Sequence, residues 1–199
     1  HALTDTVGEL KTEVMAERIK AINPFCKVNI VDDFITLDNL REHITKDMAY
    51  VVDAIDSVKE KAGLIAFCQR QKIPVVTVGG AGGQTDPTQI QVTDLSKTSH
   101  DPLAAKVRSM LRRHYGYSKS GRRFAVECVF STEQLVYPKP DGSVCESKYI
   151  ADGQTRLDCS GGFGACTQVT ATFGFVAVSR VLKKMLERHA RQQAASANG

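Results

Sequence analysis

The 199-residue sequence contains six cysteines, but no two of them form a Cys-x-x-Cys pair. This absence excludes a zinc knuckle and a thioredoxin-like redox motif. The chain is long and we expect no secretory signal peptide, so we do not expect its cysteines to form a disulfide framework. We therefore predict a reducing compartment, the cytoplasm, for this protein.

Charged residues are missing from residues 159–179, a stretch long enough to span a membrane. The stretch also has no leucine or isoleucine, and its glycine, threonine and glutamine residues make its hydropathy weak for a span. We predict a buried helix at a homodimer interface, and membrane association is the alternative.

A glycine-rich turn that binds phosphates is missing as well. Residues 79–83 include four glycines, but they match neither Gly-x-Gly-x-x-Gly nor a P-loop, and no helix with a phosphate-binding lysine follows. Because glycine permits positive φ and close approach of the backbone, we interpret this run as a flexible exit from a sheet beside the active site.

What the sequence does contain is an alternation of strand-like and helix-like segments. The expected strands are residues 26–31, 50–53, 75–78, 88–93 and 124–130. The expected helices are residues 6–22, 38–44, 58–71, 102–114 and 159–191. Short links between the first elements favour a parallel sheet with helices packed on it, in a single domain. Residues 137–156 are expected to form loops or a hairpin, and residues 192–199 a disordered polar tail.

Two carboxylates, Asp53 and Asp56, lie where the strand at residues 50–53 is expected to end. Ser57 and Glu60 form a Ser-x-x-Glu capping box, so a helix is expected to begin here. Ligands bind at the carboxyl ends of strands in open α/β sheets, and a carboxylate there can hold a Mg²⁺ that carries a nucleotide phosphate. The alternative is that Asp56 or Ser57 is only a helix cap.

A second capping box, Thr6 to Glu9, predicts the start of the helix that runs to Ile22. Lys11 lies near the N-terminus of this helix, where the helix dipole favours anions. Two roles remain open for Lys11, a solvated surface lysine and a phosphate ligand.

Positive charge is concentrated in two segments of the chain. Residues 106–123 contain seven Lys or Arg and no acid, and residues 180–191 contain five with one acid, although the whole chain has a net charge of only +4. One such cluster is explained by a solvated helix face. Two clusters, one of them interleaved with His114, Tyr115 and Tyr117, favour a polyanionic partner such as RNA.

Eight short motifs are spread over the chain. They are Val7-Gly8-x-x-Lys11, Asp53-Ala-Ile-Asp56-Ser, Lys72-Ile-Pro74, Gly79-Gly-Ala-Gly-Gly-Gln84, and residues 86–94, 101–106, 128–132 and 170–178. Together they resemble the ubiquitin-activating-enzyme-like superfamily of ATP-dependent adenylating enzymes, and within it the tRNA threonylcarbamoyladenosine dehydratases. The resemblance implies a single ThiF-type α/β domain over residues 1–199, with a Rossmann-like, mixed and mostly parallel sheet and a C-terminal helix.

The resemblance also implies an activity. ATP and Mg²⁺ would activate the carboxylate of threonylcarbamoyladenosine next to the tRNA anticodon, and an internal nitrogen or oxygen would then displace AMP and close a ring. By this resemblance Lys11 contacts the ATP phosphates and Asp56 holds Mg²⁺. Asp53 and Lys61 lie beside that site and are candidate cofactor-binding residues. The side chains implied to bind tRNA phosphates are Arg112, Arg113, Lys119, Arg122 and Arg123.

Part of the superfamily pattern is absent from this sequence. The Gly-x-Gly-Gly-x-Gly turn, the acidic ribose ligand and the Asn and Arg residues that reach ATP all precede the point that corresponds to His1. We therefore expect a domain truncated at its N-terminus, and we expect these residues alone to be inactive.

Two alternative functions remain open. One is adenylation of the C-terminus of a sulfur-carrier or ubiquitin-like protein, although residues 84–100 lack the cysteine nucleophile that such relatives use. The other is a binding partner in a cysteine desulfurase system. Cys159 is the candidate reactive thiol because it lies at an expected helix N-terminus, which lowers the pKa of a thiol. A buried structural cysteine is the alternative there, and Cys128 is expected to be structural.

Overall fold

The computed structural model describes residues 3–138, 143–145 and 164–197. The chain forms two compact units, His1–Thr36 and Leu37–Gly199. The first unit contains α1 (Lys11–Ile22), and the second contains all the strands and the other helices of the described residues.

In the first unit, α1 begins five residues later than its capping box predicts. The hydroxyl of Thr6 accepts a hydrogen bond from Leu3 N at 2.9 Å and donates one to Leu3 O at 3.2 Å, so Thr6 closes a turn instead of capping a helix. The N-cap residue is Leu10, whose side chain caps nothing. The prediction of a helix start at Thr6 is therefore wrong, and Lys11 is the first residue of α1.

The predicted strand at residues 26–31 is also wrong. Ile30 and Val31 remain 45% and 47% exposed, and none of the strand pairs in the described part of the chain includes this segment. A strand is stable only when a neighbour satisfies its backbone hydrogen-bonding groups, and local sequence does not reveal whether one exists.

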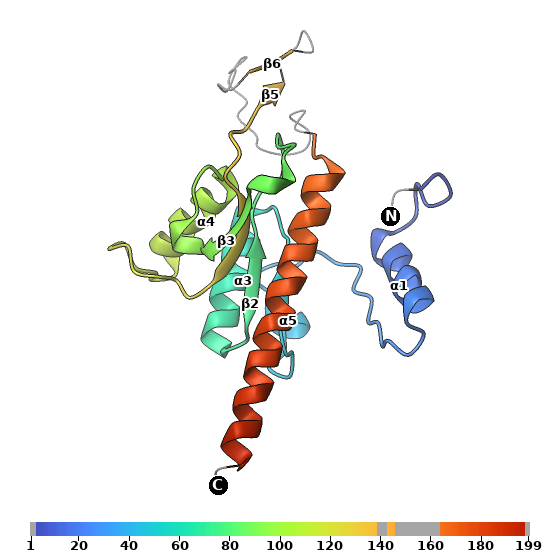
Figure 1. Ribbon diagram of the computed structural model, residues 1–199, viewed down its shortest axis with the longest axis vertical. Coiled ribbons are helices and arrows are strands. Elements are labelled where there is room, and N and C mark those ends of the chain that lie inside the picture. Colours follow the sequence, from blue (N-terminus) through green and yellow to red (C-terminus); the bar gives the residue numbers. More distant parts are fainter. Residues whose placement is uncertain (1–2, 139–142, 146–163, 198–199) are drawn as a thin grey trace. The chain divides into compact units, whose positions relative to one another are not determined.

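The second unit is built on a four-stranded sheet of order β1-β2-β4-β3 (Figure 1). Its strands are β1 (Val51–Asp53), β2 (Val75–Val78), β3 (Ile90–Asp94) and β4 (Glu127–Ser131). β1 pairs with β2 and β2 with β4 in parallel, whereas β3 pairs with β4 antiparallel. The predicted mixed and mostly parallel sheet is thus confirmed.

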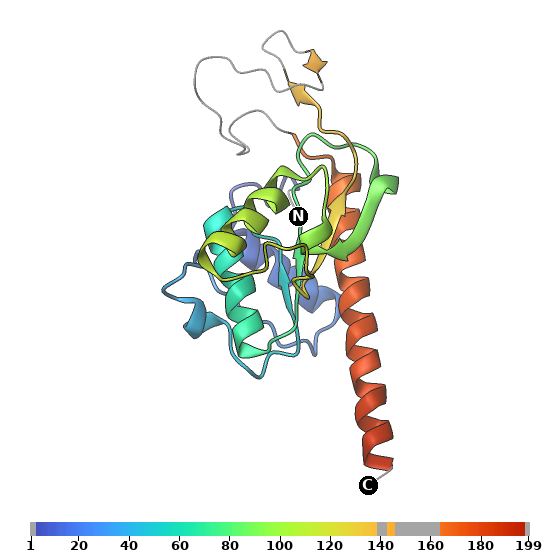
Figure 2. The same cartoon turned by 90° about the vertical axis from the view of Figure 1, so that its left-hand side faces the viewer.

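Helices cover both faces of this sheet (Figures 1 and 2). One face carries α3 (Val58–Gln71) and α4 (Pro102–His114), which pack against each other, and the other carries α5 (Thr167–Ala197). Asp101 caps α4 as predicted, since its carboxylate accepts a hydrogen bond from Ala104 N at 2.8 Å. The short elements are α2 (Leu40–His43), η1 (Pro87–Gln89), η2 (Leu95–Lys97), β5 (Tyr137–Pro138) and β6 (Val144–Cys145). The strands β5 and β6 form an antiparallel hairpin.

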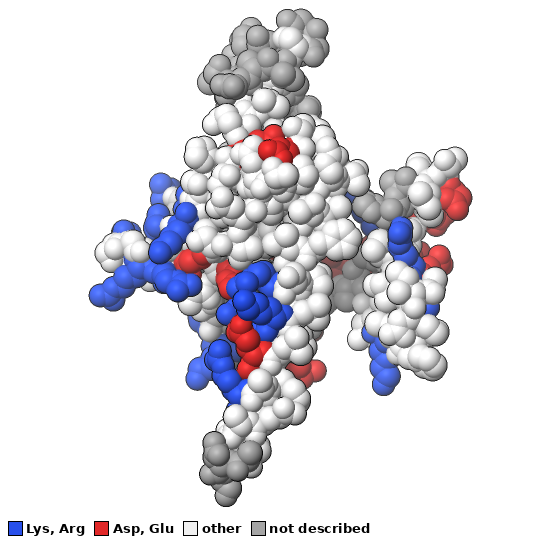
Figure 3. Space-filling model, viewed as in Figure 1, with Lys and Arg blue, Asp and Glu red and all other residues white. Residues whose placement is uncertain are grey.

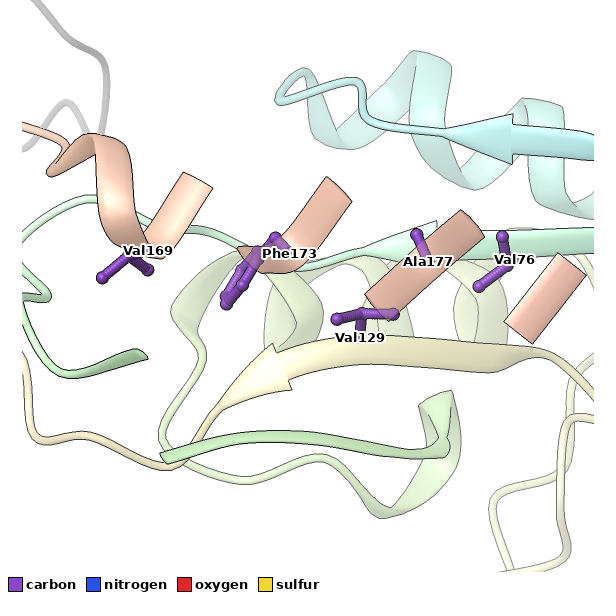
Figure 4. Packing of buried hydrophobic residues seen from close by; sticks show 5 residues of the cluster. All are labelled: Val76, Val129, Val169, Phe173 and Ala177. Atoms are coloured by element: carbon purple, nitrogen blue, oxygen red, sulfur yellow. The ribbon is translucent and has the colours of Figure 1, made fainter. Parts of the chain in front are cut away.

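α5 is buried on one face only. Val169, Phe173 and Ala177 lie on successive turns and point toward Val76 of β2 and Val129 of β4 (Figure 4). The opposite face is exposed, so the prediction of a buried helix holds for one side of it. The helix continues to Ala197 and includes most of the segment for which we expected a disordered tail. Among the described residues, no helix combines the length and apolar character needed to cross a membrane.

An ion pair between Arg180 of α5 and Glu127 of β4 connects the helix to the sheet. Arg180 donates to both carboxylate oxygens of Glu127 on β4, from Nε at 3.0 Å and from Nη2 at 2.6 Å. The hydrogen bonds from Arg180 are the main reason that the pKa of Glu127 lies below its ordinary value of 4.5, and burial opposes them.

We expect Arg180→Gln to lower the free energy of unfolding by about 1–2 kcal/mol at neutral pH, because hydrogen bonds to charged groups contribute about that much. Since the pKa of Glu127 is depressed in the folded state, the difference is full above pH 4.5 and disappears as pH falls through the lowered value. Urea denaturation of both proteins across this range measures it. Lys184→Gln is the control, because Lys184 Nζ lies 3.9 Å from Glu127 and is partly exposed. If Arg180→Gln lowers the free energy of unfolding equally at every pH, the lost stability does not come from the interaction with ionised Glu127.

Candidate active site

A cleft of about 660 Å³ opens at the carboxyl ends of β1 and β2. Its walls are the ends of these strands, residues 79–82, the first turns of α4 and one side of α5. Leu103, Leu135 and Phe173 make much of the wall apolar, and Asp56 and Lys106 are the charged residues among its described lining. A crevice at this edge of an α/β sheet is the usual position of a ligand site.

Asp56 lies on the loop between β1 and α3, where it is exposed and lines the cleft. The N-cap residue of α3 is Ser57, so the alternative role of Asp56 as the helix cap is not the one observed. Ser57 donates its hydroxyl hydrogen bond to the carboxylate of Glu60, and its side chain makes no bond to the helix backbone. The sequence therefore locates the helix start correctly, although the reciprocal capping box is not formed.

Asp53 and Lys61 form a buried ion pair beneath the cleft. Both residues are 1% exposed, and Lys61 Nζ lies 3.0 Å from Asp53 Oδ2. Asp53 Oδ2 also accepts from the Thr77 hydroxyl at 2.7 Å, and Oδ1 accepts from Ile55 N at 3.1 Å. The pair thus connects the end of β1 to β2 and α3. This buried ion pair therefore supports the loop that carries Asp56. Direct contact of Asp53 or Lys61 with a cofactor stays a prediction.

Asp101 supports the cleft in two ways, of which the sequence predicts only one, the capping of α4. It is 3% exposed, and besides capping α4 it accepts from Gly80 N at 3.0 Å. A Cβ on Gly79 would lie 1.8 Å from Asp101 Oδ2, so this approach requires glycine. Burial raises the pKa of the Asp101 carboxyl, against the opposing effect of its hydrogen bonds and of the charge of Lys61. The start of the glycine run is therefore held against α4, which differs from the flexible exit that we expected.

Lys11 is exposed at the first residue of α1, in the unit His1–Thr36. Its predicted contact with phosphates stays a prediction.

The five predicted tRNA-binding residues lie at the end of α4 and in the loop after it. Figure 3 shows Lys and Arg side chains gathered over this region and again along α5. Arg112 donates to Ser118 O at 3.2 Å and its guanidinium lies 5.4 Å from the centroid of the Phe124 ring. Arg123 lies 3.7 Å from Asp94. The other three, Arg113, Lys119 and Arg122, are exposed.

The cysteines of the sheet and of α3 are buried. Cys128 on β4 is 1% exposed and burial raises the pKa of its thiol, which agrees with the structural role predicted for it. Burial raises the pKa of Cys68 to about 11. Neither thiol therefore has the lowered pKa of a nucleophile. Cys159, the predicted reactive thiol, lies outside the described residues.

Comparison with known sequences finds one family and relatives that share one name. The ThiF family matches residues 2–198. A tRNA threonylcarbamoyladenosine dehydratase from Escherichia coli (strain K12) is 61% identical over 193 residues, which cover 96% of this chain and 72% of that protein. A protein of the same name from Bacillus subtilis (strain 168) is 37% identical over 141 residues, which cover 71% of this chain and 53% of that protein.

Solved structures agree with these relatives in fold. A structure named TcdA (CsdL) matches with a TM-score of 0.86 at 58% identity and covers 96% of this chain and 71% of its own. A crystal structure of E. coli tRNA N6-threonylcarbamoyladenosine dehydratase in complex with ATP matches with a TM-score of 0.82 at 56% identity, with coverages of 96% and 70%. The chain belongs to the ThiF family and, within it, to the tRNA threonylcarbamoyladenosine dehydratases.

Proposed function

We propose that this chain functions in the ATP-dependent dehydration of threonylcarbamoyladenosine next to the tRNA anticodon. The observation that carries the proposal is the cleft at the strand ends with Asp56 in its lining, in a fold that matches an ATP complex at 56% identity. Since tRNA modification takes place where tRNA is used, we also propose a cytoplasmic location.

The reaction balances without any further reactant. An oxygen of the threonylcarbamoyl carboxylate attacks the α-phosphorus of ATP, and the bond to pyrophosphate breaks. An internal nitrogen or oxygen of the substrate then attacks the activated carbonyl carbon and loses its proton, and AMP leaves with the original carboxylate oxygen. The product is a ring that has lost one water, together with AMP and pyrophosphate.

The residues of the cleft fit a nucleotide with its metal ion. Mg²⁺ in nucleotide sites is held by one or two carboxylates together with the phosphates, and Asp56 offers one exposed carboxylate. We propose Asp56 as this ligand, and Lys106 adds positive charge to the cleft lining. From the resemblance to the adenylating enzymes we also propose that Lys11, in the unit His1–Thr36, contacts a phosphate. When bound, Mg²⁺ neutralises phosphate charge as pyrophosphate leaves.

The test is nucleoside analysis of tRNA that carries threonylcarbamoyladenosine, after incubation with the full-length protein, because residues 1–199 alone are expected to be inactive. We expect a nucleoside lighter by one water, formed only when ATP is present, with AMP released in equal amount. Pyrophosphate release that needs a sulfur-carrier protein and no tRNA, with AMP retained on the carrier's C-terminus as an acyl-adenylate, would instead support the alternative adenylation function.

We propose that the exposed basic residues Arg113, Lys119 and Arg122 bind tRNA phosphates. Changing all three to glutamine is expected to weaken tRNA binding and to reduce the slope of log K against log salt by about 0.7–0.9 for each phosphate that the variant no longer neutralises. Arg112 and Arg123 are left in place because they contact Phe124 and Asp94.

The matched control for this triple variant removes three other exposed charges, Lys20, Lys27 and Lys46, which lie outside both basic segments. Titration of labelled tRNA at several salt concentrations measures both proteins. Equal slopes for the two triple variants would mean that the loop after α4 is only a solvated surface.

We also propose a homodimer through the exposed face of α5. Phe175, Val178, Leu182 and Leu186 lie on one stripe of that helix and are between 51% and 77% exposed, opposite the face that covers the sheet. Such a stripe is typical of a helix that packs against another helix. Sedimentation velocity should give twice the chain mass, and Leu182→Glu with Leu186→Glu should give the monomer.

A further inference from the structure

A second pocket, of about 400 Å³, lies between α2 and the C-terminal half of α3. Its lining includes Leu40 and Arg41 of α2, Phe67 and Arg70 of α3, and Tyr115, and we call it the α2–α3 pocket. It shares no lining residue with the cleft at the strand ends. Tyr115 belongs to the basic segment 106–123, so the pocket adjoins that segment.

The α2–α3 pocket combines flat apolar surface with two positive charges, Arg41 and Arg70, and one negative charge, Asp38. Leu40 is 4% exposed, and Phe67 and Tyr115 are half-buried, so they form an apolar wall. The guanidinium of Arg70 lies 5.8 Å from the centroid of the Tyr115 ring, and Arg70 Nε donates to Ala66 O at 3.3 Å. Arg41 is exposed in the last turn of α2.

These features match the chemistry of a nucleotide, which has a flat base and an anionic phosphate. Aromatic side chains stack on bases of any sequence, and arginine binds phosphate through its planar fork of donors. Proteins stack on bases mainly where RNA is single-stranded, because bases in a duplex are not accessible to such a wall. The neighbouring basic segment supplies charge along which an RNA backbone can continue.

We propose that the α2–α3 pocket binds one unpaired nucleotide of the tRNA substrate. Its base packs on Tyr115 and Phe67, and its phosphate binds Arg41 and Arg70. This inference rests on the proposed function, because it takes tRNA as the ligand, but the pocket is separate from the site of the reaction.

Two single substitutions separate the contributions of base and phosphate to tRNA affinity. Arg41→Gln should lower the affinity about threefold to fivefold and reduce the salt slope by about 0.7–0.9, since one phosphate is no longer neutralised. Tyr115→Leu should lower the affinity for tRNA at least about fivefold and leave the salt slope unchanged, because stacking of a base on the ring releases no counterions. The control is Lys72→Asn, because Lys72 is next to Gln71 in the chain but does not line the pocket. Asparagine tolerates the φ of 59° found at Lys72.

Abasic substitution identifies the nucleotide. Each unpaired position of the tRNA is replaced in turn by an abasic residue, and one position is expected to weaken binding to the unchanged protein but not to the Tyr115→Leu variant. Such non-additivity reports direct contact. If every abasic position acts equally on both proteins, the pocket does not take a base of this RNA. Chemical shift changes with free AMP at Tyr115, combined with unchanged tRNA affinity of both variants, would assign the pocket to a mononucleotide and overturn the RNA proposal.

AMP release keeps this inference distinguishable from the proposed function. The pocket variants should release AMP at the unchanged rate once tRNA is saturating. If the unchanged protein releases AMP but both pocket variants bind tRNA as tightly as it does, the proposal for the α2–α3 pocket is overturned and the proposed function is kept. Weakened binding by the variants, in a protein that never releases AMP with this tRNA, would overturn the proposed function alone.

Discussion

Replacing Asp56 with asparagine is expected to reduce tRNA-dependent AMP release at least about 100-fold, which corresponds to about 2.7 kcal/mol of lost transition-state stabilisation. Asp56 is the one acidic residue among the described residues that line the cleft. Asparagine keeps the shape of the side chain but removes the negative charge that attracts Mg²⁺. The measurement is AMP release with saturating tRNA over a range of Mg²⁺ concentrations.

The control for this prediction is Glu60→Gln. Glu60 lies one turn further along the chain and accepts a hydrogen bond from Ser57, but it does not line the cleft. Its removal is expected to change AMP release less than about threefold, because surface changes away from the site have small effects. Asp56→Asn protein that folds normally and keeps its AMP release would show that Asp56 is not the metal ligand.

Lys11→Ala tests, in the same assay, the proposal that Lys11 contacts the ATP phosphates. Without its ammonium group beside the phosphates, AMP release should fall and the ATP concentration needed for half the maximal rate should rise. An unchanged dependence on ATP would leave Lys11 as the solvated surface lysine that the sequence also allows.

Local signals in the sequence predict much of this fold. β1, α3 and β2 occur where the apolar runs and the Ser57 start indicate them, and α4 begins at Pro102 after its Asp101 cap. These features depend on neighbours within a few residues, so a single sequence contains the information. The start of α1 differs from its prediction because the Thr6 hydroxyl hydrogen-bonds to Leu3, which precedes it in the chain. The Thr-x-x-Glu pattern therefore stabilises a turn here and does not cap a helix.

The supporting contacts of the site depend on residues that are far apart in the chain. Asp101 meets Gly80 across 21 positions, and Asp53 meets Thr77 across 24. The sequence shows Asp101 as a cap and Asp53 as a carboxylate near a strand end, which is correct for each. It does not show that both carboxylates are buried, since burial is decided by how the helices pack over the sheet.

Replacing Lys61 with methionine is expected to lower the free energy of unfolding by about 3–5 kcal/mol, because it leaves the carboxylate of Asp53 buried without its cation. The hydrogen bonds from Thr77 and Ile55 remain, but they do not supply the missing positive charge. Urea denaturation followed by circular dichroism measures the loss. Lys59→Gln is the matched control: Lys59 is exposed on the same helix, and its removal should cost less than about 0.5 kcal/mol.

The double variant Lys61→Met with Asp53→Asn decides what the pair does. Removing both charges leaves no uncompensated buried ion, so a large part of the lost stability should return. If the pair only supports the Asp56 loop, AMP release should return together with stability. If Lys61 contacts the nucleotide, the double variant will be stable and still inactive, and the cofactor role predicted for Lys61 will then be the correct one. A single Lys61→Met variant as stable as the Lys59→Gln control would instead mean that the fold does not depend on this ion pair.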